Sequence, residues 1–275
     1  MNKYSFLLII TIFYTASQSH AQNYTFDSVE PTTDTREIKR GNGQLYNLII
    51  TLPLDYQKEK EYKILYYLDA WWLKDLVSGC YRILSLSNKT KSNNMEDVIL
   101  VGISSVGDEQ AWNRQRNMDF TPSKYNLNYK INFGKIPLDE ATTGGAEEFL
   151  QFFKQQIIPS IESDYKVDSA SRGLLGHSLG GLLGFYSYLN NSDLFSNYIL
   201  LAPSVWWNDS EIFRDKASIV SKRESKMFTA MGTAEIKMMK EPMGILVEKI
   251  NSEKNGKLKM TYRQYENADH HSVLP

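Results

Sequence analysis

Short, continuous apolar runs alternate with helical stretches from residue 62 to residue 266. The runs YKILYYLDA (62–70), EDVILVGISS (96–105) and NYILLAPS (197–204) have the length and apolar content of strands buried on both faces. Such strands form parallel sheets, whose neighbours are joined by helical crossovers. The pattern therefore predicts an α/β fold with a mostly parallel central sheet and helices on both faces.

The N-terminal part of the chain predicts a different kind of pairing. TREIKR and QLYNLIITLP flank Gly41-Asn42-Gly43, a turn sequence typical of β-hairpins, so residues 22–53 should add antiparallel strands at one edge. Residues 107–143 lack a clear period, and their aromatic residues favour an ordered, irregular loop. Further helices are expected at 71–87, 145–165, 182–190, 210–222 and 239–251, and further strands at 226–232 and 257–266.

The first 21 residues have the three parts of a secretory leader. Lys3 supplies a basic start, an apolar run extends from Phe6 to Tyr14, and Ser19-His20-Ala21 resembles a cleavage site. A membrane anchor and a first core element are the alternatives, but the apolar run is too short to span a bilayer as a helix. We expect cleavage after Ala21 and a secreted or periplasmic product, with residues 22–275 as a single domain.

Charge and cysteine content limit the classes of partner. Lys and Arg number 31, Asp and Glu number 32, and this balance disfavours nucleic acid and anionic membrane surfaces as partners. No later apolar stretch is long enough for a transmembrane span. Cys80 is the only cysteine, so an intrachain disulfide is impossible, and its apolar helical surroundings predict a core position.

Residues 176–180 form a G-x-S-x-G motif centred on Ser178, between an apolar strand-like run and a helical one. That setting predicts a nucleophile elbow, in which a sharp strand-to-helix turn lifts the serine hydroxyl to the carboxyl edge of the sheet. The alternative is a glycine-rich packing turn with Ser178 as a helix cap. A phosphate loop is disfavoured, because no Lys-Ser/Thr pair follows the glycines.

A nucleophilic serine needs a base, and the chain has four histidines. His20 should leave with the leader, and His177 precedes the serine on the elbow, from where its ring cannot easily reach the Ser178 hydroxyl. His270 and His271 follow the last predicted strand, in the chain order serine, acid, histidine of α/β-hydrolases. Exposed terminal histidines without a role are the alternative.

The acid of such a triad should orient the imidazole and stabilise its cation. Glu235 follows the strand-like run KMFTAMG, where this fold usually carries the acid. Asp269 is the rival, although a carboxylate next to the histidine in sequence rarely reaches its ring in triad geometry. A first-turn helix acid is the other interpretation of Glu235.

Four motifs in order resemble the putative esterase family of α/β-hydrolases, which includes siderophore esterases, feruloyl esterases, S-formylglutathione hydrolases and mycolyltransferases. They are YYLDA (66–70), RNMDFTP (116–122), GHSLGG (176–181) and DHHSV (269–273), the last similar to the family's D-H-x-S-V. The resemblance covers nearly all of the chain after the leader. Relatives usually continue past the histidine into a further segment, often a helix on the sheet, so a chain ending at Pro275 is expected to be a short or a truncated member.

The resemblance implies roles for the residues in these motifs. Ser178 is implied as the nucleophile and His270 as the base, with His271 on the variable position. The oxyanion hole is implied to use the backbone amides of Leu179 and of Ala70 or Trp71. Position 70 is often glycine in the family. This chemistry needs no metal or organic cofactor, and three histidines without a cysteine pair disfavour a zinc site.

Several aromatic and basic residues are expected near the carboxyl ends of the strands, where they could contact substrate. These candidates are Trp72, Arg116, His177, Trp206 and Trp207. Ordinary packing of the tryptophans is the alternative, as is pairing of the arginine with a local acid such as Asp119.

The expected function is that of an exported serine esterase that forms an acyl-enzyme. Its substrate would be an aromatic, siderophore or glycan-linked ester. An acyltransferase with the same triad and a catalytically inactive binding protein of the same fold are the alternatives. The oligomeric state is left open.

Overall fold

The computed structural model describes residues 31–89, 95–126, 138–190, 193–214, 216, 224–253 and 257–274. These residues belong to one unit, Pro31–Pro275. The predicted leader lies outside them, as does most of the helix expected at 210–222. Across the described ranges, no helix has both the length and the apolar character that a bilayer span requires.

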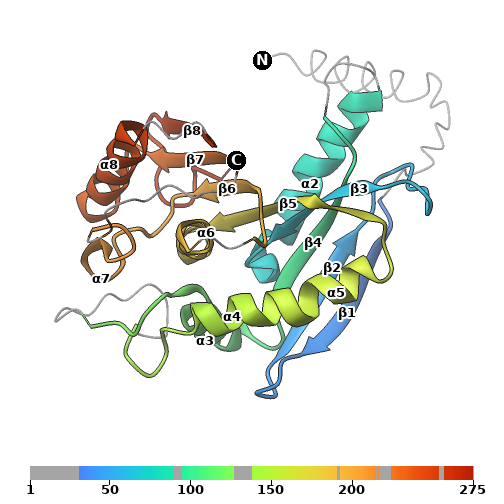
Figure 1. Cartoon of the computed structure of the whole chain (residues 1–275), viewed down its shortest axis with the longest axis horizontal. Helices are drawn as coiled ribbons and strands as arrows, with labels where there is room; N and C mark the ends of the chain where they lie inside the picture. Colours follow the sequence, from blue (N-terminus) through green and yellow to red (C-terminus); the bar gives the residue numbers. More distant parts are fainter. Residues whose placement is uncertain are drawn as a thin grey trace, which may run out of the picture. The chain divides into compact units, whose positions relative to one another are not determined.

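The described strands form an eight-stranded sheet in the order β1-β2-β4-β3-β5-β6-β7-β8 (Figure 1). β3 to β8 pair in parallel, whereas β2 is antiparallel to both β1 and β4. The prediction of a mostly parallel sheet with an antiparallel hairpin at one edge is thus confirmed. The strand bounds are β1 Thr33–Lys39, β2 Leu45–Thr51, β3 Tyr62–Tyr67, β4 Val98–Ser105, β5 Val167–His177, β6 Asn197–Leu201, β7 Ser225–Gly232 and β8 Leu258–Tyr265.

The helices follow the strands in the predicted alternation, with one irregularity. A π-helical segment, Phe153–Ile157, joins α4 to α5 within the stretch predicted as a single helix. Pro159 has no N–H to donate, and the preceding amide, that of Ile158, bonds five residues back to the Phe153 carbonyl. The helix bounds are α2 Ala70–Lys89, α3 Glu109–Phe120, α4 Ala146–Phe152, α5 Ile158–Glu162, α6 Leu179–Leu189, α7 Trp207–Ser210 and α8 Lys237–Ser252.

Side chains of β3 alternate between two apolar clusters on opposite faces of the sheet. Ile64 and Tyr66 join the main core, which also receives buried residues of α4, α6 and α8. Tyr67 joins a smaller cluster with Tyr81 of α2, and Leu65 packs against it. Helices therefore cover both faces, as expected from strands that are apolar throughout.

Helix α3 lies within the segment predicted to be irregular, and that part of the prediction is wrong. Asp108 caps the helix by accepting a hydrogen bond from the Ala111 amide, at 2.9 Å. The buried side of the helix is mostly polar, so no apolar period marks it in the sequence. Its buried residues are Asn113, Gln115, Asn117, Asp119 and Phe120.

The start of the helix expected at 210–222 also differs from the prediction. Asn208, Asp209 and Ser210 all have positive φ angles, of 44°, 59° and 64°. This left-handed backbone does not continue into a regular α-helix, and residues 211–214 form turns. The short α7 therefore ends where the longer helix was expected to begin.

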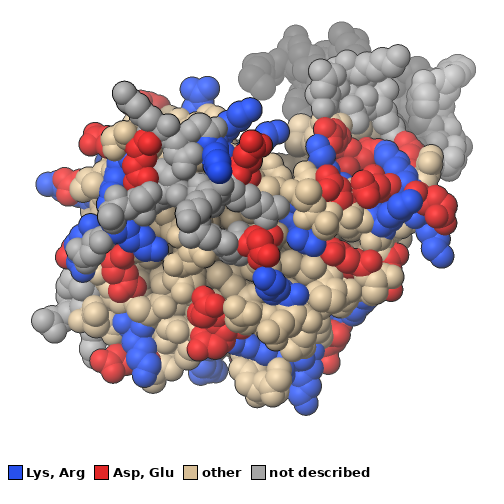
Figure 2. Space-filling model, viewed as in Figure 1, with Lys and Arg blue, Asp and Glu red and all other residues tan. Residues whose placement is uncertain are grey.

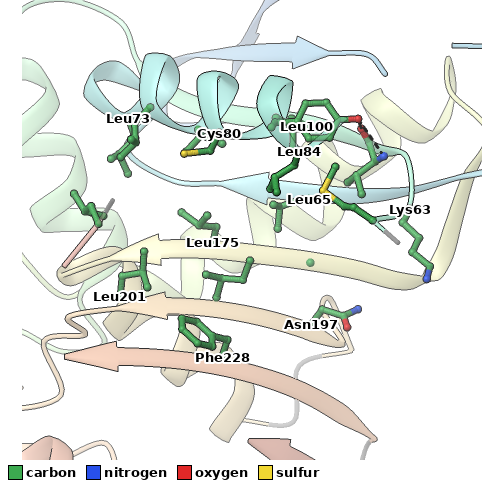
Figure 3. A pocket seen from close by; sticks show the side chains of 18 of the residues that line it. Lys63, Leu65, Leu73, Cys80, Leu84, Leu100, Leu175, Asn197, Leu201 and Phe228 are labelled. Carbon is green, nitrogen blue, oxygen red and sulfur yellow. Dashed lines mark hydrogen bonds between the residues drawn. The ribbon is translucent and has the colours of Figure 1, made fainter. Parts of the chain in front are cut away.

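An apolar cavity of about 520 Å³ lies on the face of the sheet that α2 covers, between α2 and the strands β5, β6 and β7 (Figure 3). Leu175, Ile199 and Phe228 line its floor, and Cys80 of α2 lines its wall. Cys80 is exposed, so its predicted core position is wrong. The apolar side of α2 that carries Cys80 borders this cavity, where the described chain places no second helix against the sheet.

Acidic and basic side chains are interspersed over the face of the molecule in Figure 2. Several of them pair across elements, as do Lys154 with Asp193 at 3.0 Å and Arg172 with Glu162 at 2.7 Å. This arrangement agrees with the net charge of −1.

Two helical glycines provide a matched test of the close contact between α6 and the sheet. A Cβ at Gly184 in α6 would overlap Leu200 Cδ2 of β6, whereas a Cβ at Gly244 in α8 would meet nothing within 4 Å. We expect Gly184→Ala to lower the free energy of unfolding by about 1–3 kcal/mol. Gly244→Ala should raise it by about 0.5–1 kcal/mol, since alanine has the higher helix propensity.

Urea denaturation of both variants measures these changes. Equal stabilisation by both substitutions would contradict the tight packing of α6 on β6.

Candidate active site

β5 passes directly into α6 at Ser178, through a sharply bent backbone. Ser178 has φ 59° and ψ −116°, a conformation that residues other than glycine rarely adopt. A Cβ at Gly176 would overlap the backbone of Gly180, so this turn requires glycine at its start. The Ser178 amide donates to the Leu201 carbonyl, and the Ser204 amide donates to the Ser178 carbonyl, each at 3.0 Å. The turn is thereby tied to the end of β6.

Three side chains from distant parts of the sequence form a hydrogen-bonded chain at this turn. His270 Nε2 lies 2.9 Å from Ser178 Oγ, and His270 Nδ1 lies 3.0 Å from Glu235 Oε2. The Glu235 side chain is fully buried, while that of His270 is 21% exposed. In the neutral imidazole with its proton on Nδ1, Nε2 can accept the serine proton while Nδ1–H donates to the carboxylate.

Asp269 does not contact the His270 ring but organises the turn that carries it. Its carboxylate accepts hydrogen bonds from the amides of His271 and Ser272 and from the Ser272 hydroxyl, at 2.8–3.0 Å. The Ser272 donors, followed by the His271 amide, lower the pKa of Asp269 to about 2. Asp269, the alternative triad acid considered from the sequence, thus forms its hydrogen bonds within its own loop.

Two helices, α6 and α2, begin near the serine turn. Leu179 opens α6, and Ala70 and Trp71 open α2, so intrahelical carbonyls do not reach their N–H groups. In the turn between β3 and α2, the residue with positive φ is Asp69, at 55°. Ala70 therefore does not need the backbone conformations that only glycine adopts readily. A Cβ at Gly180 in α6 would lie 3.6 Å from the Asp69 carboxylate, which shows how closely the two turns approach.

Asp69 anchors the second turn to α3. Its buried carboxylate accepts from Arg116 Nε at 3.0 Å, from Arg116 Nη2 at 3.1 Å and from Trp112 Nε1 at 2.9 Å. Trp71 stacks on Trp112, with ring centroids 5.3 Å apart and an interplanar angle of 12°. The YYLDA and RNMDFTP motifs therefore meet in space, and their meeting fixes the backbone at Ala70 and Trp71.

The five expected substrate contacts occupy different environments. Trp206 and Trp207 are buried in the core, where Trp207 Nε1 donates to Ser123 Oγ at 3.1 Å, and their contact with substrate stays a prediction. Ala202, directly after β6, has a left-handed backbone with φ 42°. Trp72 is half-buried, with its ring centroid 6.3 Å from that of His271.

The other two candidates are already engaged by the protein. The Arg116 side chain is 11% exposed and pairs with Asp69 rather than with Asp119, which instead binds Arg40 and Tyr46. His177 is 2% exposed, and its Nε2 lies 2.7 Å from the His270 carbonyl oxygen. Both side chains hold loops of the site, and their contact with substrate stays a prediction.

Two residues of the site were not among the sequence candidates. Asp69 anchors the α2 turn, and its position inside the YYLDA motif was the available signal. Ser204 Oγ lies 3.3 Å from Ser178 Oγ and is buried, and it follows β6 without any motif that could identify it.

Comparison with known proteins places this arrangement in context. The sequence model of the family described as "Putative esterase" matches residues 41–273. The ferri-bacillibactin esterase BesA of Bacillus subtilis (strain 168) is 25% identical over 256 residues, which cover 89% of this chain and 86% of BesA.

Solved structures of similar proteins support the same fold. The BES protein from Bacillus cereus superposes with a TM-score of 0.77 at 25% identity, over 88% of this chain and 91% of that one. The siderophore hydrolase EstA from Aspergillus nidulans superposes with a TM-score of 0.68 at 21% identity, over 88% and 90%. The second likeness shows a shared fold alone.

The ion pair between Asp69 and Arg116 should contribute strongly to stability. We expect Asp69→Asn to lower the free energy of unfolding by about 3 kcal/mol, because it leaves a largely buried guanidinium without its counter-charge. Asp75→Asn, at an exposed position in the adjoining helix α2, should change the free energy of unfolding by less than about 0.5 kcal/mol. Urea denaturation compares the two, and equal effects would show that the pair does not hold the turn.

Proposed function

Because this chain belongs to the Putative esterase family and is a serine carboxylic ester hydrolase with the α/β-hydrolase fold, we propose that Ser178, His270 and Glu235 are its catalytic triad. The observation that carries the proposal is the hydrogen-bonded chain from Ser178 Oγ through both nitrogens of His270 to Glu235. It begins at a serine held in strained backbone geometry, as nucleophile elbows are.

The proposed reaction has two halves. His270 Nε2 removes the Ser178 proton as Oγ attacks the ester carbonyl, and Glu235 stabilises the imidazolium. The amides of Leu179 and of Ala70 or Trp71 donate to the oxyanion. The carbon–oxygen bond to the alcohol then breaks, with the His270 proton passing to the leaving oxygen. Water, deprotonated by His270, attacks the acyl-enzyme; the bond to Ser178 Oγ then breaks, the His270 proton returns to Oγ, and the carboxylic acid is released.

We propose a siderophore ester or a related aromatic ester as the substrate. The support is the description of BesA as a ferri-bacillibactin esterase, together with an aromatic surface next to the α2 turn. Trp71 is 38% exposed and stacked on Trp112, so it offers a flat ring face near the amides proposed for the oxyanion hole. Export after cleavage at Ala21 is part of the proposal, and it rests on the composition of the first 21 residues.

The two terminal histidines offer a matched pair of variants. His270→Ala should lower kcat for p-nitrophenyl acetate by a factor on the order of 10⁴ or more, because the serine loses its base. His271→Ala should keep activity within a few-fold of the wild type, since its ring is not part of the hydrogen-bonded chain. Ser178→Ala supplies the background rate. Full activity in His270→Ala would refute the assignment.

Covalent labelling and a substrate panel complete the test. A fluorophosphonate should label the wild-type protein at Ser178 and leave Ser178→Ala unlabelled. Siderophore, feruloyl, aryl and short-acyl esters at equal concentration should rank with the siderophore or aromatic esters highest in kcat/KM. Preference for short acyl groups would overturn the substrate assignment, and transfer to added glycerol in place of hydrolysis would indicate an acyltransferase.

A further inference from the structure

The imidazole of His177 lies beside that of His270 without entering the hydrogen-bonded chain. The ring centroids are 4.7 Å apart, and His177 Nε2 is 2.7 Å from the backbone carbonyl oxygen of His270. A carbonyl oxygen can only accept, so Nε2 of His177 carries the proton and donates it. The residue directly before the nucleophile is thereby bonded to the backbone of the proposed base.

The proposed base sits on a short loop after β8, and most of the described contacts of that loop lie on either side of His270. The Ala234 amide donates to the Ala268 carbonyl at 2.9 Å, and the Val273 side chain is 3% exposed. Asp269 holds the turn through its own neighbours. The bond from His177 contacts His270 itself, and it comes from the elbow that also presents Ser178.

The environment of His177 keeps the ring a neutral donor. Burial, followed by the neighbouring His270, Arg116 and His271, lowers the pKa of His177 to about 3. Among the described residues nothing bonds to its Nδ1, which is buried. Trp72 packs edge-on against the same ring, with centroids 5.7 Å apart. The tautomer with the proton on Nε2 is thus the one that this site accommodates at neutral pH.

We propose that His177 is a positioning residue that fixes the backbone of His270 to the nucleophile elbow and so sets the distance between Nε2 of His270 and the Ser178 hydroxyl. Ser178 and His177 are adjacent on one turn, and His177 holds the backbone of His270. Motion of the loop after β8 therefore does not change the distance between Ser178 and His270. The proposal rests on the proposed roles of Ser178 and His270.

Two substitutions at position 177 separate the hydrogen bond from the packing. His177→Gln can place an amide N–H near the position of Nε2, whereas His177→Leu fills space without a donor. We expect His177→Leu to lower kcat for p-nitrophenyl acetate by up to about 100-fold with KM within twofold, since misplacement by about 1 Å has effects of this size. His177→Gln should restore most of kcat, and the rate of fluorophosphonate labelling should follow the same order.

The outcomes distinguish this proposal from the triad assignment. A wild-type protein that the fluorophosphonate does not label would refute the proposed function itself. A labelled and active wild type with full kcat in His177→Leu, or with equal losses in the Leu and Gln variants, would overturn only the positioning role.

If His177→Leu does not fold, nitrogen-15 NMR of histidine-labelled wild-type protein still decides the matter. The His177 ring should keep the proton on Nε2 from pH 5 to pH 8. A proton on Nδ1, or titration within that range, would overturn the proposal.

Discussion

The bent backbone at Ser178 is the constraint on which the site depends. A serine at φ 59° is strained, and the strain persists because the surrounding contacts leave the chain no alternative. Gly176 lets the start of α6 approach β5, and hydrogen bonds to Leu201 and Ser204 tie the turn to β6. The hydroxyl therefore projects at the carboxyl edge of the sheet, where the loops after the other strands can reach it.

A second turn is held to the first by a buried charge. Asp69 accepts three hydrogen bonds from α3, and its carboxylate lies against the first turn of α6. A buried carboxylate without hydrogen-bond partners would destabilise the fold, so Asp69 requires Arg116 and Trp112 as its partners. The amides of Ala70 and Trp71 owe their position to this pair. Two motifs whose first residues, Tyr66 and Arg116, are 50 positions apart in the sequence therefore form one structural unit.

Predictions from the sequence succeeded where a local pattern reports the structure directly. The apolar runs predicted the parallel strands, and Gly41-Asn42-Gly43 predicted the hairpin of β1 and β2. They failed at α3, whose buried side is polar and whose stability comes from partners such as Asp69. They also failed at Cys80, which was predicted to lie in the core but is exposed, because an apolar helical pattern does not indicate which side of α2 packs on the sheet.

The sequence alone determined the strands and, apart from α3 and α7, the helices between them, together with the serine on its glycine-flanked turn and the short set of possible bases. These follow from neighbours along the chain, which the pattern of residue types records. Only the tertiary structure placed Glu235 at 3.0 Å from His270, occupied Asp269 with its own turn and bonded His177 to the His270 carbonyl. Those contacts join residues up to 93 positions apart, and they depend on how the loops converge at the sheet edge, which no local pattern records.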